Sequence, residues 1–378
     1  MDRSKWEYKK LCDVALITMG QSPSSDSYNE EGKGLPFFQG NADFGILHPK
    51  VRVYCDAPQR EANENDILMS VRAPIGAINI ANTHCCIGRG LCAITPQERC
   101  LDLKYLYYFL ISKNGYLNQQ GTGSTFKSIS KKIIFDLSIP VPSLADQQSI
   151  SGEIDCLNEM LALKQEQLKE FDKLAQSIFY DMFGDGNWKS RKIKDIAKVK
   201  IGPFGSSLHQ YDYITGGTPL VNPIHMINGK IVVDNDFTIT EEKKTELTSY
   251  LLKTNDIVFG RRGDIGRCAL VTDKENGYLC GTGSMFVRFD IDIDPTYALC
   301  ELSSKEIKKY LLDNAKGATM LNINGGIVEN IPVPLPPLAL QQQFAEKIQA
   351  IEAQKELVKQ SIAETQHLFD SRMDYYFN

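Results

Sequence analysis

Side chains suited to reading nucleic acid recur in the turns of this 378-residue chain. Glycine- and serine-rich runs at 20–25, 121–125, 202–207 and 281–284 expose backbone N–H groups and small hydroxyls, which suit phosphates or base edges. Arginine fits the major-groove edge of guanine, asparagine and glutamine fit adenine, and serine and threonine serve either base or phosphate. The candidate DNA-contacting residues in or beside these turns are Gln21, Ser22, Ser24, Gln39, Asn41, Arg72, Arg89, Thr122, Ser124, Lys127, Ser206, Ser207, Asn222, Arg261, Arg262, Thr319 and Asn322.

Arg261 and Arg262 form the strongest single pair among these candidates. They interrupt an otherwise apolar strand ending and precede Gly263, which permits backbone conformations closed to other residues. Each polar residue also has an ordinary interpretation as a solvated or capping side chain, and we expect fewer than half to touch bases. A second function class stays open, a scaffold whose globular ends bind other proteins. A steep loss of DNA affinity with rising salt would favour the DNA reader.

Catalytic chemistry finds little support in the sequence. Residues 222–225, Asn-Pro-Ile-His, differ at the third and fourth positions from the Asn-Pro-Pro-aromatic motif of adenine methyltransferases. Glu241-Glu242-Lys243 resembles the acidic and lysine residues of nucleases, but such triplets arise by chance in a chain with 47 acidic residues. The glycine-rich runs lack the third glycine of a nucleotide-binding loop, and the five histidines form no triad-like group. The sequence therefore predicts a non-catalytic protein.

The ten cysteines include no C-x-x-C pair and are expected to be reduced, largely buried thiols. His84, Cys85, Cys86 and Cys92 lack the paired spacing that structural zinc sites use, so no metal site is predicted. No apolar run approaches the roughly 18 residues of a membrane span, and no apolar segment follows the charged residues at the start. These features favour a cytoplasmic protein.

The elements that must position these turns occur twice. The stretch 136–171 recurs at 330–365 with a shift of 194 residues, and each copy is a short strand-like run, a proline cluster, a Gln-Gln pair and a long helix. Residues 6–15 align with 188–197, 65–76 with 255–266, and 123–130 with 317–324. The chain is therefore predicted to hold two copies of one mixed domain, at 1–143 and 187–337, each followed by a long helix, at 144–186 and 338–378.

The net charge of -5 is distributed unevenly over these segments. The globular segments carry 16 Lys+Arg against 14 Asp+Glu and 19 against 18, whereas the helices carry 3 against 9 and 4 against 6. Acidic helices would stay off DNA, while near-neutral domains can still present a local basic surface. The charge pattern therefore favours DNA contact by the domains rather than by the helices.

Each helix carries an apolar stripe with four-three spacing, which needs a partner helix. We predict that the two helices pair as an antiparallel coiled coil. The predicted seam is Ile150, Ile154, Leu157, Leu161, Leu168, Phe171, Phe344, Ile348, Ile351, Val358, Ile362 and Phe369. Lys164 and Lys355 interrupt the stripes, either because they extend out of the seam or because they set the register of the pair.

The parts and their order resemble the specificity subunit (HsdS) of type I restriction-modification systems. The resemblance rests on W-E-Y-K-K-L-C-D-V-A and W-K-S-R-K-I-K-D-I-A near the domain starts, on N-D-I-L and N-D-I-V within the domains, and on P-S-L-A-D-Q-Q and P-P-L-A-L-Q-Q before the helices. It covers essentially the whole chain and implies an α+β fold: two duplicated target-recognition domains, each followed by a long helix, with the helices paired and related by pseudo-two-fold symmetry.

The resemblance also implies a function. Each domain would read one half of a bipartite DNA site, the helices would set the spacer, and two modification methyltransferase subunits would dock, with restriction and translocase subunits joining the larger complex. S-adenosylmethionine would belong to the methyltransferase, ATP and magnesium to the restriction partner, and no cofactor to this chain. Base-contacting residues vary within the family and are not carried over. The repeated elbows are the predicted partner-binding site: Pro140, Pro142, Leu144, Gln147, Gln148, Pro334, Pro336, Leu338, Gln341 and Gln342.

Overall fold

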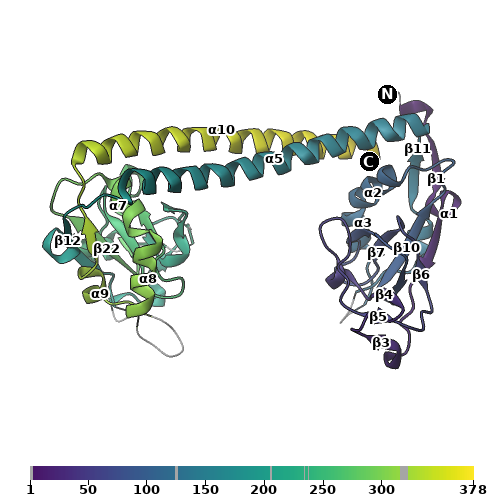
Figure 1. Ribbon diagram of the computed structural model, residues 1–378, viewed down its shortest axis with the longest axis horizontal. Helices are drawn as coiled ribbons and strands as arrows, with labels where there is room; N and C mark the ends of the chain where they lie inside the picture. Colours follow the sequence, from purple (N-terminus) through teal and green to yellow (C-terminus); the bar gives the residue numbers. More distant parts are fainter. Residues whose placement is uncertain (1–2, 124–126, 205–206, 234, 237, 316–321) are drawn as a thin grey trace. The chain divides into compact units, whose positions relative to one another are not determined.

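The computed structural model describes residues 3–123, 127–204, 207–233, 235–236, 238–315 and 322–378. The chain forms two compact units, Met1–Glu166 with Val358–Asn378, called unit 1, and Gln167–Leu357, called unit 2. Each unit contains one globular domain and parts of two long helices, α5 (Leu144–Phe183) and α10 (Leu338–Phe377) (Figure 1). The predicted fold class, two mixed domains with two long helices, is confirmed.

The domain of unit 1 is built on an antiparallel sheet with the strand order β2-β10-β7-β8. The four residues of β7 are all buried, because alternate side chains face two hydrophobic clusters on opposite sides of the sheet. A second sheet has the order β3-β5-β4-β9-β6, and β1 pairs with β11 just before α5. The strands are β1 (Glu7–Lys10), β2 (Ala15–Met19), β3 (Tyr28–Asn29), β4 (Leu35–Phe38), β5 (Tyr54–Cys55), β6 (Glu61–Ala62), β7 (Ile67–Ser70), β8 (Ile78–Ile80), β9 (Cys85–Ile87), β10 (Leu91–Pro96) and β11 (Ser138–Val141).

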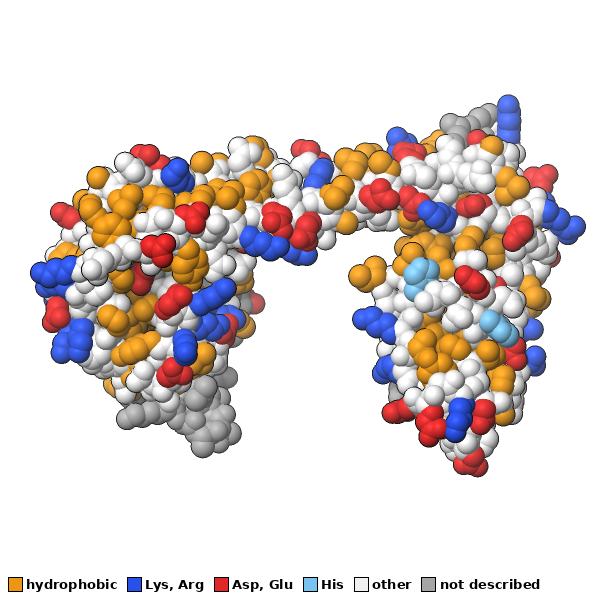
Figure 2. Space-filling view, in the orientation of Figure 1, with side chains coloured by type: hydrophobic (Ala, Val, Ile, Leu, Met, Phe, Trp, Pro, Cys, Tyr) orange, Lys and Arg blue, Asp and Glu red, His pale blue; other side chains and the backbone are white. Residues whose placement is uncertain are grey.

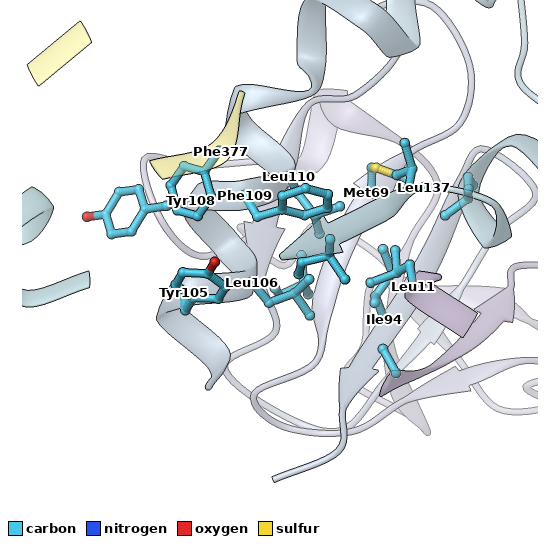
Figure 3. Packing of buried hydrophobic residues seen from close by; sticks show 14 of the residues in the cluster. Leu11, Met69, Ile94, Tyr105, Leu106, Tyr108, Phe109, Leu110, Leu137 and Phe377 are labelled. Carbon is cyan, nitrogen blue, oxygen red and sulfur yellow. The ribbon is translucent and has the colours of Figure 1, made fainter. Parts of the chain in front are cut away.

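Helices cover the side of the β2-β10-β7-β8 sheet that faces α5. They are α1 (Leu11–Val14), α2 (Leu103–Ser112), α3 (Asn114–Gln119) and α4 (Lys131–Phe135). Asp102 caps the start of α2, and its side chain accepts the Tyr105 N–H at 2.9 Å. Figure 3 shows Tyr105, Leu106, Phe109 and Leu110 of α2 packing in this core with Met69 and Ile94 of the sheet.

Unit 2 repeats this plan. Its main sheet has the order β13-β22-β19-β20, a second sheet has the order β14-β18-β15-β21, and β12 pairs with β23 just before α10. The strands are β12 (Ser190–Lys192), β13 (Ala197–Ile201), β14 (Tyr213–Ile214), β15 (Thr218–Val221), β16 (Met226–Ile227), β17 (Lys230–Ile231), β18 (Thr238–Ile239), β19 (Ile257–Gly260), β20 (Cys268–Leu270), β21 (Leu279–Cys280), β22 (Ser284–Phe289) and β23 (Pro332–Pro334). The helices are α6 (Glu241–Glu246), α7 (Pro295–Leu302), α8 (Lys305–Asn314) and α9 (Gly325–Glu329).

Helices α5 and α10 pair antiparallel within each unit. In unit 1, Glu153 contacts Arg372 and Tyr376, and Lys164 contacts Ser361 and Thr365. A step of 11 residues forward along α5 is thus matched by 11 residues backward along α10. In unit 2, Asp172 of α5 pairs with Lys355 of α10 at 2.7 Å, while Phe179 and Phe344 pack at 5.6 Å between ring centroids. The predicted antiparallel arrangement is confirmed in both units.

The far end of each long helix closes a domain core. Phe377, at the end of α10, lies 5.2 Å from Tyr105 between ring centroids in unit 1. Phe183, at the end of α5, lies 4.8 Å from Tyr297 in unit 2. Phe183 and Phe377 are related by the same shift of 194 residues as the helices, so both copies of the repeat use the same aromatic contact.

The predicted seam residues lie at two levels of burial. Ile150, Ile154, Leu157, Leu161, Phe344 and Ile351 are buried, and Leu168, Phe171, Ile348, Val358, Ile362 and Phe369 are half-buried. Both lysines in the stripes bond across the pair: Lys164 Nζ donates to Ser361 Oγ and Thr365 Oγ1 at 2.7 Å each, and Lys355 pairs with Asp172. These bonds at defined levels favour the interpretation that the lysines set the register.

Glu301 makes the stability of unit 2 depend on pH. Burial, and secondarily the nearby Glu306 carboxylate, raises the pKa of Glu301 from 4.5 to about 7. The folded protein therefore binds one more proton than the unfolded chain between these two values, and unit 2 loses stability as pH rises through them. We expect Glu301→Gln to match the wild type near pH 4.5 and to exceed it by about 3 kcal/mol at pH 8. Urea unfolding over a pH series measures this difference, and a difference that does not change with pH would contradict it.

Candidate nucleic-acid interface

Three turns of unit 1 meet at one edge of its main sheet, where β2 and β7 end and β10 begins. The Gly20 N–H donates to the Leu91 carbonyl at 2.9 Å, the Gly88 N–H to Phe38 at 2.8 Å, and the Val71 N–H to Gly90 at 2.9 Å. These bonds bring together the neighbouring residues Gln21, Gln39 and Arg89, whose side chains are exposed. Ser22 joins them, because its Oγ accepts the Arg89 N–H at 3.3 Å.

Glycine is needed where these turns approach each other. A Cβ on Gly20 would lie 2.2 Å from the Gly88 carbonyl oxygen, and one on Gly90 would lie 2.3 Å from the Gln39 carbonyl oxygen. Both distances are far below van der Waals contact. The glycine-rich sequence at this edge therefore serves close packing of the turns, and the polar residues beside the glycines supply the side chains.

A second group of predicted residues joins the same edge. Arg72 forms an antiparallel bridge with Ser128, and the Ala73 N–H donates to the Lys127 carbonyl at 3.1 Å. Thr122 N–H donates to Ser128 at 3.0 Å. Arg72, Thr122 and Lys127 are exposed, as is Ser24, while Asn41 is half-buried; Ser124 lies outside the described residues. We call this assembly of turns, at 20–24, 38–41, 71–73, 88–90, 122–123 and 127–128, the loop edge of unit 1.

Unit 2 has a loop edge built by the same backbone bonds. Gly202 N–H donates to Ser284 at 3.0 Å, Gly281 N–H to Val221 at 3.0 Å, and Arg261 N–H to Gly283 at 2.9 Å. Arg262 forms an antiparallel bridge with Asn322, as Arg72 does with Ser128. Asn222 Oδ1 accepts the Gly283 N–H at 3.4 Å. The two edges thus place Arg72 and Arg262 at equivalent positions.

The two arginines predicted as the strongest pair differ in exposure. Arg262 is exposed. Arg261 is half-buried, its Nε donates to the Ile323 carbonyl at 3.5 Å, and burial together with the charge of Arg262 lowers its pKa. Its side chain therefore helps to hold the loop, and Arg262 is the better candidate for DNA contact. Ser207 is half-buried, and Ser206 and Thr319 lie outside the described residues.

The elbows that precede the long helices are locked inside each unit by the first glutamine of the Gln-Gln pair. Gln147 is 0% exposed; its Oε1 accepts the Asp102 N–H at 2.8 Å, and its Nε2 donates to the carbonyls of Cys100 and Pro142 at 2.9 and 2.8 Å. Gln341 is 2% exposed; its Oε1 accepts the Asp294 N–H at 2.9 Å, and its Nε2 donates to Pro336 at 2.8 Å.

This burial corrects part of the predicted partner site. The side-chain amides of Gln147 and Gln341 already have hydrogen-bond partners inside their units and are not available to a partner protein. Pro140, Pro142 and Pro336 are buried as well. Leu144 and Pro334 are half-buried. Gln148, Gln342 and Leu338 are exposed. Gln342 lines an open groove of about 1260 Å³ in unit 2, between α5, α7 and the start of α10.

The residues that complete the hydrogen bonding around each elbow were not among those predicted from the sequence. Asp102 and Asp294 cap α2 and α7, and three residues later Tyr105 and Tyr297 donate from Oη to the carbonyls of Pro140 and Pro334, at 2.9 Å each. The signal was present as a repeated D-x-x-Y with a shift of 192 residues. The same set of hydrogen bonds therefore holds the elbow in one conformation in both units.

The exposed leucines on the long helices were also not among the residues predicted from the sequence. Leu163 and Leu174 of α5, and Leu357 and Leu368 of α10, are between 44% and 71% exposed and are related by the shift of 194 residues. On each helix the two leucines are 11 residues apart, about three turns, and so lie on the same face. Figure 2 shows hydrophobic side chains at the surface of the paired helices.

The motifs considered for other chemistries have structural roles. In Asn222–His225, the His225 side chain is buried and its Nδ1 lies 2.9 Å from the Leu220 carbonyl. Lys243 pairs with Glu246 at 3.0 Å on the surface helix α6. His84 pairs with Glu61, while Cys85, Cys86 and Cys92 are buried. Among the described residues, no three His, Cys, Asp or Glu side chains are grouped to hold a metal ion, and no helix is long and apolar enough to cross a membrane.

Comparison with known proteins identifies the family. The model of the type I restriction modification DNA specificity domain matches residues 3–171 and again 185–367. The chain therefore belongs to the family of type I restriction-modification specificity subunits and carries its domain twice. A non-DNA scaffold is not favoured by this membership.

Several relatives carry the same designation. A putative type I restriction enzyme specificity subunit, MjaX of Methanocaldococcus jannaschii, is 38% identical over 175 residues, which is 46% of this chain and 41% of that protein. The MjaIX specificity subunit of the same organism is 22% identical over 92% of this chain and 86% of its own. The EcoBI specificity subunit of Escherichia coli is 18% identical over 94% and 81%.

Two solved structures share the fold. The S subunit of a type I system from M. genitalium has a TM-score of 0.55 at 17% identity, covering 99% of this chain and 96% of that chain. The HsdS subunit from Thermoanaerobacter tengcongensis has a TM-score of 0.50 at 16% identity, covering 98% and 96%. Both comparisons support the arrangement of two mixed domains and two long helices.

Proposed function

We propose that this chain recognises a bipartite DNA site, with the loop edge of each unit reading one half-site in the major groove. The observation that carries the proposal is the recurrence of one loop edge, built by the same backbone bonds and presenting an exposed arginine at the equivalent position, Arg72 and Arg262. Arginine is the residue best suited to guanine there. The chain itself is non-catalytic and needs no cofactor in this proposal.

The paired helices set the spacer between the half-sites. Each is a single helix of 40 residues, about 60 Å at the usual rise. The lysine contacts described above hold one register of the pair, and the surplus of acidic residues on both helices keeps them away from phosphates.

Two modification methyltransferase subunits are the proposed partners of the helices and elbows. The exposed leucines occur at equivalent positions on α5 and α10, which suits two copies of one partner. Apolar side chains exposed in a repeated pattern indicate an interface. The methyltransferase would bind S-adenosylmethionine and receive the flipped target adenine. Restriction and translocase subunits, with ATP and magnesium, would join the complex in the cytoplasm.

Modification mapping tests the proposed function. DNA from cells that co-express this chain with its neighbouring methyltransferase gene should carry methylated adenine at a bipartite sequence with an unspecified spacer. Exchanging residues 187–337 for the corresponding segment of another family member should change only one half-site, which also assigns each half-site to a unit. Absence of a bipartite site, or a change in both half-sites on exchange, would overturn the proposal.

We expect Arg72→Ala and Arg262→Ala each to weaken recognition of one half-site only. Loss of a guanine contact costs about 1 to 3 kcal/mol, or about 5- to 150-fold in affinity. Binding of the assembled complex to duplexes with single base changes measures the effect for each half-site. Arg99→Ala is the control, because Arg99 is exposed in unit 1 beyond the opposite end of β10. An equal loss at both half-sites would show general phosphate contact instead.

A further inference from the structure

The most exposed apolar side chain in the described part of unit 1 is at the tip of a loop beside the predicted contact residues. Ile46 is 102% exposed and the adjacent Leu47 is 40% exposed. The loop follows a short 3-10 helix at Asn41–Asp43 and leads to β5. Ile46 packs against no core, so its side chain adds nothing to the stability of the fold.

The loop that carries Ile46 is held firmly. Asn79 is 1% exposed, its Oδ1 accepts the Gly45 N–H at 3.0 Å, and its Nδ2 donates to the Gly45 carbonyl at 3.2 Å. The Ile80 N–H donates to the Leu47 carbonyl at 2.8 Å, and His48 Nδ1 lies 2.9 Å from the Ile80 carbonyl. A buried amide and an edge strand thus fix both sides of the tip, which lowers the entropy lost when the tip binds.

The same loop is tied to the loop edge through one buried carboxylate. Asp43 is 6% exposed, and its Oδ2 accepts the N–H groups of Gln39 and Gly40 at 2.7 and 3.4 Å. Its carbonyl accepts the Lys50 N–H at 2.8 Å, and its Oδ1 accepts Arg52 Nε at 3.0 Å. Asp43 therefore fixes the backbone at Gln39 and also the base of the loop that carries Ile46.

The chemistry of this tip suits a defined feature of DNA. In the major groove, thymine is distinguished from cytosine by its 5-methyl group, and an aliphatic side chain is the complementary contact. Lys50 on the same loop is exposed, and its positive charge favours nearby phosphates. The loop therefore presents an exposed aliphatic side chain together with positive charge.

We propose that Ile46 is a specificity-determining residue of unit 1 that packs against the 5-methyl group of a thymine in its half-site. This inference rests on the proposed function and adds to it, because the polar candidates explain guanine and adenine contacts but leave thymine unread. The bonds of Asn79 to Gly45 and of Ile80 to Leu47 hold the backbone on both sides of Ile46.

Replacing thymine by deoxyuridine tests this contact, because it removes the methyl group and keeps every hydrogen bond. Duplexes carrying the mapped site, with each thymine of the unit 1 half-site replaced in turn, are bound to the complex assembled with its methyltransferase subunits. For the wild type we expect about a fourfold loss of affinity at one position, the value of one buried methyl-sized group. Ile46→Ser should show the same loss on the thymine duplex and no further loss on deoxyuridine, and Ile46→Val should retain most of the wild-type preference.

Two controls distinguish a methyl contact from a general loss of apolar surface and from unfolding. Leu16→Ser changes an exposed leucine of β2 in the same unit and should leave the methyl preference intact. Ile46→Ser should keep the wild-type melting temperature, because the side chain has no core contacts.

Two binding results would overturn the inference while site-specific binding of the wild type persists. An equal loss on thymine and deoxyuridine duplexes in Ile46→Ser would indicate a wedge between base pairs. No loss on either duplex would indicate that Ile46 contacts a protein. Failure of the wild type to bind any site would instead reject the proposed function.

Discussion

Replacing Gln147 by alanine is expected to destabilise unit 1 by about 2 to 4 kcal/mol, and replacing Gln341 is expected to do the same to unit 2. Gln147 is completely buried and makes three hydrogen bonds to backbone groups of the segments that meet at the elbow. Without it, the Asp102 N–H and two carbonyl groups lose their partners in a place that water does not reach freely. An unsatisfied buried group costs about 1 to 3 kcal/mol.

Urea unfolding followed by hydrogen exchange measures this effect and locates it. Exchange should become faster around α2 and the start of α5 in Gln147→Ala, and around α7 and the start of α10 in Gln341→Ala. Gln148→Ala and Gln342→Ala are matched controls, since these neighbouring side chains are exposed. If the two pairs of variants lost equal stability, or if Gln147→Ala weakened only partner binding, the elbow would be a docking site and the structural role assigned to Gln147 would be wrong.

Lengthening both helices by one heptad is expected to change the spacer of the recognised site and leave both half-sites unchanged. Seven residues add about 10 Å to a helix, which is the rise of up to three base pairs. We expect modification mapping to show one to three additional base pairs in the spacer. The effect is large because a wild-type site of the original length would lose methylation.

The structure determines where the insertions must be made. Glu153 faces Arg372 and Tyr376, and Lys164 faces Ser361 and Thr365, so an insertion after Leu161 is level with one after Thr365. Leu161 and Lys355 are at corresponding positions in the two copies of the repeat, but they are not level with each other in the helix pair. Insertions after these two residues would shift Lys164 away from Ser361 and Thr365. Inserting a heptad in α5 alone is the control, because it breaks the pairing and should abolish modification. Altered half-sites with an unchanged spacer would reject the role of the helices as a ruler.

The fold could be predicted largely because of the duplication. Each copy supports the assignment of the other, so the segments 65–76 and 255–266, which contain β7 and β19, could be aligned although neither is distinctive alone. The four-three stripes predicted the helices and their partner, because a helix of that length cannot bury such a stripe against one domain. The antiparallel direction was an inference from the length of the intervening chain, and the contacts within both units confirm it.

The roles of individual polar residues could not be predicted in the same way. Gln147 and Gln148 are adjacent and chemically identical, yet one is buried and the other exposed. Arg261 and Arg262 divide similarly, because successive residues at the end of a strand point to opposite faces. A sequence pattern identifies the residue types that occur in a turn. It does not show which of two adjacent side chains faces the core, because a short irregular turn has no regular alternation of buried and exposed residues.

The sequence by itself determined the duplicated architecture, the helices with their apolar seam and the family, because these depend on periodic patterns summed over many residues. Only the tertiary structure decided which turns meet at the loop edges, that the first glutamine of each elbow is buried, and that Ile46 is fully exposed. These features depend on hydrogen bonds between segments far apart in the chain, such as Asn79 with Gly45 and Gln147 with Asp102. Such contacts are set by the packing of the whole domain, and the helix and strand periods of the sequence do not reveal them.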